Sequence, residues 1–211
     1  MSAPQIFEAA FYPDTKVIQN NGPYFFYRQE IGTLKCESGK IIACNPAQID
    51  LAVPFDHCFP TGLFPVQLAI AKRNQDEKVA FARILFSDRH VASWKLADME
   101  VRTFGPLQDT CKSCYTTDSG RGIFIGEFSK DRFRQMDENL QKDTFYNRPL
   151  NFKNTSLIYE FDNYNLAIFP TGEGPGCYKT YLGFDKRGII CQLLTDFELI
   201  PWWNLNEENG I

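Results

Sequence analysis

The chain has 211 residues, of which 44% are hydrophobic and 23% are charged, and its formal net charge is −4 at pH 7. This composition is ordinary for a globular protein and excludes disordered and collagen-like chains. A mildly acidic chain without basic clusters is a poor match for nucleic acid, so we expect no nucleic-acid partner. A chain of this length buries about 70% of its surface on folding, which is enough for one core. We therefore expect a single domain over residues 1–211.

In the first part of the chain, short apolar or alternating runs predict β-strands at Lys40–Cys44, Val66–Ala71, Lys78–Phe86, Val91–Ala97 and Gly122–Phe128. The run Lys78–Phe86 is apolar on both faces, a pattern that only a central strand covered on two sides tolerates. In the Val91–Ala97 run, the alternation predicts that Trp94 and Leu96 point inward.

A single helix is predicted, over residues 129–143. Ser129 is a suitable N-cap, and the residues that follow place an apolar stripe on one side, made of Phe133, Met136 and Leu140. The opposite side, which includes Lys130, is expected to face solvent.

The last third of the chain predicts two hairpins, which pair Leu157–Phe161 with Tyr164–Phe169 and Cys177–Phe184 with Ile189–Phe197. Asp162 and Asn163 suit the first turn, and Gly188 can adopt the positive φ that closes the second. A polar tail follows at residues 201–211. Together these elements predict a mostly β fold, either a single β-sandwich or a rolled antiparallel sheet, with one packed helix.

The expected location is the cytoplasm. Met1–Gln5 has neither a basic stretch nor an apolar core, so no signal peptide is expected. The most apolar segment, Leu51–Ala71, contains three prolines and an aspartate and lacks the roughly 20 uninterrupted apolar residues of a membrane-spanning helix. We therefore expect no membrane contact, and the seven cysteines are expected to be reduced thiols.

Common catalytic motifs are missing from the sequence. It contains no glycine-rich nucleotide loop, no HExxH zinc motif and no GxSxG nucleophile motif. With only His57 and His90, a three-histidine metal site is impossible. The absence of these motifs favours a protein that is not an enzyme and that needs no cofactor.

One weak metal alternative remains. Cys111 and Cys114 have the spacing of a zinc knuckle, and His57 with Cys58 could complete four ligands. The favoured interpretation is two free thiols in a loop, because zinc sites usually contain a second pair at similar spacing.

Acidic residues at the junctions of strands and loops form the best remaining constellation. They are Asp118, Glu173, Asp185 and Asp196. If they converged, they could bind a divalent cation or act as a general acid and base. The alternative is that each one caps a local turn. Tyr178 ends a loop with three glycines, which could cradle an anion or simply allow a tight approach into the last hairpin.

Arg83 is the one charged residue inside the most apolar strand, so a buried ion pair is expected there. Its predicted partner is Asp118 or Asp196.

Seven motifs follow one another along the chain: Ser38–Pro46, Pro60–Val66, Val79–Ile84, Asp118–Gly122, the glycine loop ending at Tyr178, Tyr181–Asp185 and Thr195–Phe197. In this order, from about residue 30 to residue 200, they resemble the bacterial family of unknown function DUF4241. The resemblance implies no established activity. This chain has Asn45 and Pro175 where the family pattern implies aspartates, and these departures favour a binding role over an acidic active site.

The sequence therefore predicts a non-enzymatic bacterial interaction protein that binds another protein stoichiometrically, as an immunity or antitoxin factor or a defence-complex subunit does. The aromatic content (19 Phe, 9 Tyr and 3 Trp) suits such a role. The loops that carry Asp118, Glu173, Tyr178, Asp185 and Asp196 are predicted to meet a partner with a basic surface. One alternative is a small hydrolase or cation-dependent enzyme that uses Asp118, Glu173 and Asp196, with His57 as a base. The other is a sensor of a small ligand.

Overall fold

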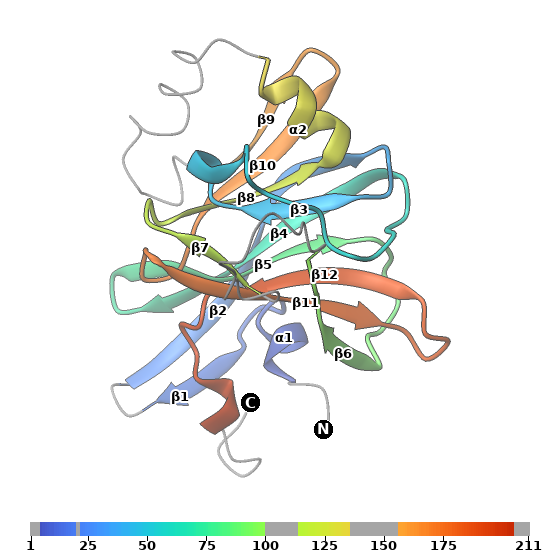
Figure 1. The fold of residues 1–211 in the computed structure, drawn as a ribbon. Coiled ribbons are helices and arrows are strands. Elements are labelled where there is room, and N and C mark those ends of the chain that lie inside the picture. Colours follow the sequence, from blue (N-terminus) through green and yellow to red (C-terminus); the bar gives the residue numbers. More distant parts are fainter. Residues whose placement is uncertain (1–4, 20–21, 100–113, 136–155, 205–211) are drawn as a thin grey trace, which may run out of the picture.

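A computed structural model describes residues 5–19, 22–99, 114–135 and 156–204 of the chain (Figure 1). In these residues β-strands dominate, and the strands form two sheets whose paired neighbours all run antiparallel. The predicted mostly β fold is confirmed.

The larger sheet has eight strands in the order β1-β2-β4-β5-β12-β11-β6, and β7 also pairs with β11. Its strands are β1 Lys16–Gln19, β2 Gly22–Cys36, β4 Gly62–Arg73, β5 Asp76–Leu85, β6 Ser93–Leu96, β7 Cys114–Thr117, β11 Gly176–Phe184 and β12 Ile190–Asp196. The strands β6 and β7 share one edge of β11, with β7 beside its first half and β6 beside its second half.

The smaller sheet has four strands in the order β3-β8-β10-β9. These are β3 Ile41–Cys44, β8 Arg121–Gly126, β9 Leu157–Phe161 and β10 Tyr164–Pro170. The described helices are short, namely α1 Ile6–Ala9 and α2 Glu127–Phe133, with 3-10 turns η1 Pro46–Gln48 and η2 Trp202–Asn204. None of the described helices has the length and apolar character to cross a membrane.

The main core lies between the two sheets. The larger sheet contributes Leu34 and Leu193, and the smaller sheet contributes Phe124 and Phe169, all of them essentially inaccessible to solvent. Burial of these apolar side chains is the main favourable contribution to folding. The arrangement is therefore a β-sandwich with a strongly curled larger sheet (Figure 1).

The outer face of each sheet is also covered. On the larger sheet, Phe7 of α1 packs its ring against Phe81, Trp94, Tyr181 and Trp202. On the smaller sheet, Phe133 of α2 packs edge-on against Phe161. Because both faces of β5 are covered, its two-sided apolar pattern is explained, and its predicted central position, between β4 and β12, is confirmed.

Both predicted hairpins are confirmed, as β9–β10 and β11–β12. Asp162 has a φ of 50° and Gly188 a φ of 76°, so each turn uses the left-handed conformation that its sequence predicted.

The predicted helix over 129–143 starts at a different residue, although Phe133 of its predicted apolar stripe is buried as expected. Gly126 is the N-cap residue, and the helix begins at Glu127, so the N-cap assigned to Ser129 is wrong. Lys130 is buried rather than solvated, and its Nζ donates a hydrogen bond to the carbonyl oxygen of Ala52. The stripe residues Met136 and Leu140 lie outside the described residues.

Several details of the strands also differ from the prediction. Leu96 is 37% exposed, because β6 is an edge strand whose outer side is open to solvent. Val66–Ala71 is buried on both faces instead of alternating. The longest strand, β2 with 15 residues, was not predicted, because its alternating pattern is interrupted by charged residues and by Gly32.

Candidate functional site

Two connections between the sheets meet at one end of the molecule. The strands β7 and β11 are neighbours in the larger sheet, and β8 and β10 are neighbours in the smaller one. The β7–β8 connection and the β10–β11 connection therefore cross side by side, with Thr117 opposite Gly176 and Arg121 opposite Pro170. We call residues 117–121 and 171–176 the loop end.

A buried asparagine holds the first of these connections. The side-chain nitrogen of Asn45 donates to Oδ1 of Asp118 at 2.7 Å, and its oxygen accepts from Oγ of Ser119 at 2.9 Å and from the amide of Ala47 at 3.2 Å. Asn45 has no exposed surface, so its polar atoms must be satisfied by protein groups. Asp118 itself is exposed, but the hydrogen bond from the buried Asn45 side chain anchors its carboxylate.

The second connection is held by a threonine and a tyrosine. Oγ1 of Thr171 and the hydroxyl of Tyr178 both donate to the carbonyl oxygen of Gly174, at 2.8 and 2.7 Å, and the amide of Thr171 donates to Gly120. Gly172 has a φ of 45°, and a Cβ there would lie 2.8 Å from the carbonyl oxygen of Phe197. Burial raises the pKa of Tyr178, which therefore stays protonated and acts as a fixed donor.

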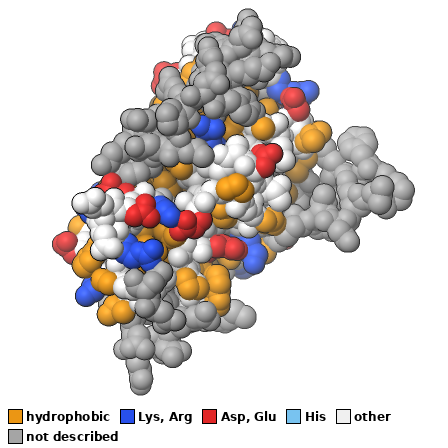
Figure 2. All heavy atoms as spheres, turned by 90° about the vertical axis from the view of Figure 1, so that its left-hand side faces the viewer, with side chains coloured by type: hydrophobic (Ala, Val, Ile, Leu, Met, Phe, Trp, Pro, Cys, Tyr) orange, Lys and Arg blue, Asp and Glu red, His pale blue; other side chains and the backbone are white. Residues whose placement is uncertain are grey.

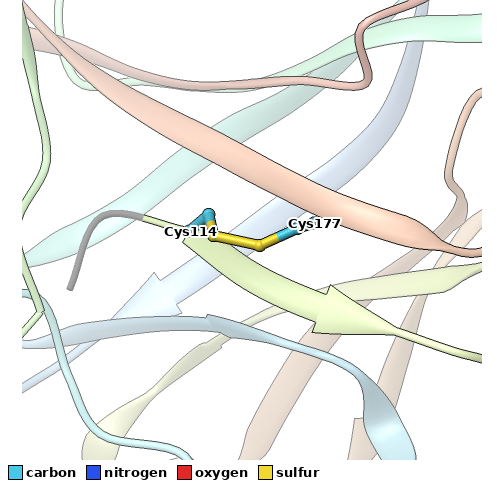
Figure 3. Close-up of a disulfide and its surroundings, with 2 residues drawn as sticks. All are labelled: Cys114 and Cys177. Atoms are coloured by element: carbon cyan, nitrogen blue, oxygen red, sulfur yellow. A yellow bond between two sulfur atoms is a disulfide. The ribbon is translucent and has the colours of Figure 1, made fainter. Parts of the chain in front are cut away.

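A disulfide joins the two connections at their base. Figure 3 shows Cys114 of β7 bonded to Cys177 of β11, with Cα atoms 5.8 Å apart. The expectation that all cysteines are reduced is therefore wrong for this pair. The pairing of β7 with β11, which spacing along the chain could not reveal, brings the two sulfurs together. Among the described residues, Cys36, Cys44, Cys58 and Cys191 are free thiols.

The disulfide also bears on the weak zinc alternative. The sulfur of Cys114 is bonded to Cys177 and is not a free thiolate ligand in this structure, whereas Cys111 lies outside the described residues. Within the described ranges, no group of three or more His, Cys, Asp or Glu side chains is arranged to hold a metal, and this includes His57 and Cys58.

Glu173 lies at the tip of the glycine loop and is exposed. Its Oε2 is 2.5 Å from Nζ of Lys78, which also approaches Asp76 at 3.3 Å. Figure 2 views the molecule from the side on which this loop lies and shows acidic and basic side chains interleaved. The carboxylate of Glu173 therefore forms an ion pair with Lys78 at the surface.

Asp196 lies near the loop end but points away from it. Its strand position is opposite Lys179, and its carboxylate accepts from Nε1 of Trp202 at 2.7 Å and from the amide of Glu198 at 2.8 Å. The side chain is on the outer face of the larger sheet, whereas Tyr178 belongs to the core between the sheets. Burial raises the pKa of Asp196 to about 6.

Asp185 lies at the opposite end of the larger sheet. The nine residues of β11 separate it from the glycine loop, a span of roughly 30 Å in extended chain. Figure 1 shows the β11–β12 turn on the far side of the molecule from that loop. The five residues predicted to act together are thus divided, with Asp118 and Glu173 at the loop end, Tyr178 buried beside it in the core, Asp196 behind the sheet and Asp185 remote.

Arg83 is buried as predicted, but its predicted partners are wrong. Its Nε and Nη2 donate to Oε1 of Gln67, at 3.0 and 2.8 Å, and its Nη1 donates to Oε1 of Gln192 at 3.2 Å. Among the described residues, it pairs with the carboxylate of Glu8 in α1, whose Oε1 lies 3.9 Å from Nη1. Of the two aspartates predicted as partners, Asp118 accepts a hydrogen bond from Asn45, and Asp196 accepts one from Trp202.

The described residues form a small β protein built from two antiparallel sheets, with a braced loop end at one end of the sheets. Residues 34–195 match the family described as "Protein of unknown function (DUF4241)". The match covers more than half of the chain, so the chain belongs to this family. Comparison with curated proteins and with solved structures finds no significant match.

Proposed function

We propose that this protein is a non-enzymatic bacterial interaction protein that binds one other protein stoichiometrically through the loop end. The observation that carries the proposal is the bracing of the loop end by the Asn45 network, the Tyr178 hydrogen bonds and the disulfide. A surface that is rigid before binding loses little conformational entropy when a partner docks. Loops held in this way suit recognition.

The exposed groups at the loop end indicate the kind of partner. Asp118 and Glu173 present carboxylates to solvent, and Glu173 can exchange its pairing with Lys78 for a cation of the partner. A partner with a basic surface fits this arrangement. An immunity or antitoxin factor or a defence-complex subunit is the proposed biological setting.

The hydrolase alternative has less support in the described residues. A general acid and base must reach the same reacting atom, which requires the carboxylates to converge. Asp118 hydrogen-bonds Asn45, Glu173 pairs with Lys78, and Asp196 faces Trp202 behind the sheet. If the enzyme interpretation held, a specific divalent cation would raise the unfolding temperature by binding only the folded protein.

The test is a pull-down of tagged protein from host lysate, followed by gel filtration of the complex. Wild type is compared with the double variant Asp118→Lys/Glu173→Lys and with Glu160→Lys, an exposed acidic residue on β9 of the smaller sheet. We expect a partner at fixed stoichiometry that the double variant loses and the Glu160→Lys variant keeps. Equal retention by all three proteins would refute the proposed surface.

We also propose that the protein acts in the cytoplasm. The disulfide makes this location testable, because disulfides are rare in the reducing cytosol. Alkylation of intact host cells, followed by mass spectrometry, measures the oxidised fraction of Cys114 and Cys177. Protein that is fully oxidised and found only outside the cytosolic fraction would contradict the proposed location.

A further inference from the structure

A basic depression lies at the end of the larger sheet opposite the loop end. It has a volume of about 430 Å³ and is lined by Arg89, His90, Asp185, Lys186 and Arg187. These residues come from the segment after β5 and from the turn between β11 and β12. We call residues 86–92 and 185–189 the turn end.

Backbone hydrogen bonds hold both segments of the turn end. The amides of Phe86 and Ser87 donate to the carbonyl oxygen of Cys191, and the amide of Ala92 donates to that of Phe184. The segment that carries Arg89 and His90 is therefore tied to the sheet on both sides. In the turn, the amide of Asp185 donates to Ile189 at 2.9 Å.

The carboxylate of Asp185 organises the arginines. Only 6% of Asp185 is exposed. Its Oδ1 accepts the amides of Arg187 and Ile189, at 2.8 and 3.0 Å, and its Oδ2 lies 3.1 Å from Nη1 of Arg89 and 3.3 Å from Nη2 of Arg187. Oδ2 of Asp185 thus contacts the guanidinium groups of both Arg89 and Arg187.

Both arginine side chains are partly exposed to solvent. The side chain of Arg89 is 46% exposed and that of Arg187 is 60% exposed, and each guanidinium carries five N–H donors. The depression also includes Lys186 and has an excess of positive charge, because Asp185 is its one acidic residue. The neighbouring Asp88 does not line it.

We propose that this depression binds a dianionic phosphoryl group. Paired planar guanidiniums match the geometry of phosphate oxygens and form charge-assisted hydrogen bonds with them. The two arginines that contact Asp185 offset its negative charge, and with Lys186 the depression keeps a net positive charge. His90 supplies an additional ring N–H donor at the wall.

The size of the depression favours a phosphoryl group carried by a small organic molecule. Its volume lies within the range of about 300–1,000 Å³ that is typical of small-ligand sites. Inorganic phosphate shares the same chemistry and fills only part of that space. The site is independent of the protein interaction proposed for the loop end.

The test is calorimetric titration of the full chain with three probes used separately: inorganic phosphate, adenosine monophosphate and phosphoserine. We expect saturable binding at one site, weakened at least about tenfold by Arg89→Gln and by Arg187→Gln. Tighter binding of an organic probe than of inorganic phosphate would identify the carried group as the source, and equal binding would identify the free anion. The matched control is Arg132→Gln, an exposed arginine that pairs with Asp162 on the smaller sheet.

The variant Asp185→Asn separates a built site from a merely basic surface. Asparagine keeps the acceptor for the turn amides but removes the charge that holds the two arginines together. A merely basic surface would bind phosphate more tightly after this change, whereas the proposed site binds it more weakly. Tighter binding, equal weakening by Arg132→Gln, or no saturable binding of any probe by wild type would overturn the proposal.

Discussion

At the loop end the chain is held by a disulfide and by hydrogen bonds of the uncharged side chains Asn45, Thr171 and Tyr178, whereas at the turn end one buried carboxylate, Asp185, contacts two arginines. The strand β11 connects the two ends, because residues 171–176 of the loop end lead into it and residues 185–189 of the turn end follow it. Covalent and neutral contacts resist salt and pH, but charged contacts do not. The comparison therefore predicts that the two ends respond to different perturbations.

Removal of the disulfide should have the largest effect. The bond closes a loop with a sequence separation of 63, and loss of such a bond costs about 2–4 kcal/mol of unfolding free energy. Cys177→Ser should lower the unfolding free energy measured in urea by this amount and increase amide hydrogen exchange at β7 and residues 171–176, with the turn end unchanged. The control is Cys58→Ser, an exposed free thiol, which should leave both properties unchanged.

Faster exchange spread equally over both ends after Cys177→Ser would show that the loop end is not an independently braced region.

The pH dependence of the unfolding free energy should have opposite signs for Asp196, at the end of β12, and Asp185, in the β11–β12 turn. Burial raises the pKa of Asp196 to about 6. Its contribution to the unfolding free energy, on the order of 2 kcal/mol, is therefore fully present below about pH 4 and is lost as the pH rises through 6. Hydrogen bonds from the Ile189 and Arg187 amides and from the arginines lower the pKa of Asp185 to about 2. Its contribution is present above about pH 4 and is lost as the pH falls through 2.

Urea unfolding between pH 2 and pH 7 measures both effects. Asp185→Asn should flatten only the acid limb of the stability profile, and Asp196→Asn only the limb between pH 4 and pH 6. The assignment fails if either variant alters the other limb.

Asn45→Asp should sharpen the comparison by placing a second carboxylate beside Asp118. The substitution replaces a donor by a carboxylate that faces Asp118 across a former 2.7 Å hydrogen bond. We expect a loss of about 1–2 kcal/mol at pH 7 that largely disappears at pH 4, where the pair can share a proton. Thermal unfolding of Asn163→Asp, an exposed asparagine in the β9–β10 turn, provides the control; an equal loss there would exclude the network as the cause.

The smallest effect should come from Glu173→Gln, which removes an exposed ion pair with Lys78. Such pairs contribute little to stability, so we expect a change below about 0.5 kcal/mol that vanishes at high salt. Denaturant unfolding at low and high ionic strength measures it. A larger, salt-independent loss would mean that Glu173 braces the loop.

The sequence was most informative where local chemistry decides the structure. Asp162 and Gly188 mark the two hairpin turns, and the two-sided apolar pattern of β5 marks the centre of the sheet. It was less informative where charged residues interrupt the alternation, as in β2, and where tertiary contacts bury a polar group, as for Lys130 beside Ala52.

The candidate sites depend on which distant segments lie together, and residue spacing along the chain does not contain that information. The β7–β11 pairing brings Cys114 to Cys177, and α1 brings Glu8 to Arg83. The sequence predicts acidic residues beside turns and offers local capping as one role for them. Asp185 and Asp196 have this role, because each accepts a hydrogen bond from the backbone amide two residues later. The contacts of Asp185 with Arg89 and of Asp118 with Asn45 join distant segments, which spacing does not reveal.

The most direct test of the whole account measures one partner against both ends. The partner retained by wild type is titrated onto Asp118→Lys/Glu173→Lys and onto Arg89→Gln/Arg187→Gln. The account predicts that the loop-end variant loses affinity by at least about tenfold, while the turn-end variant binds as wild type does. Loss of binding in the turn-end variant, with full affinity in the loop-end variant, would contradict the assignment of protein recognition to the loop end.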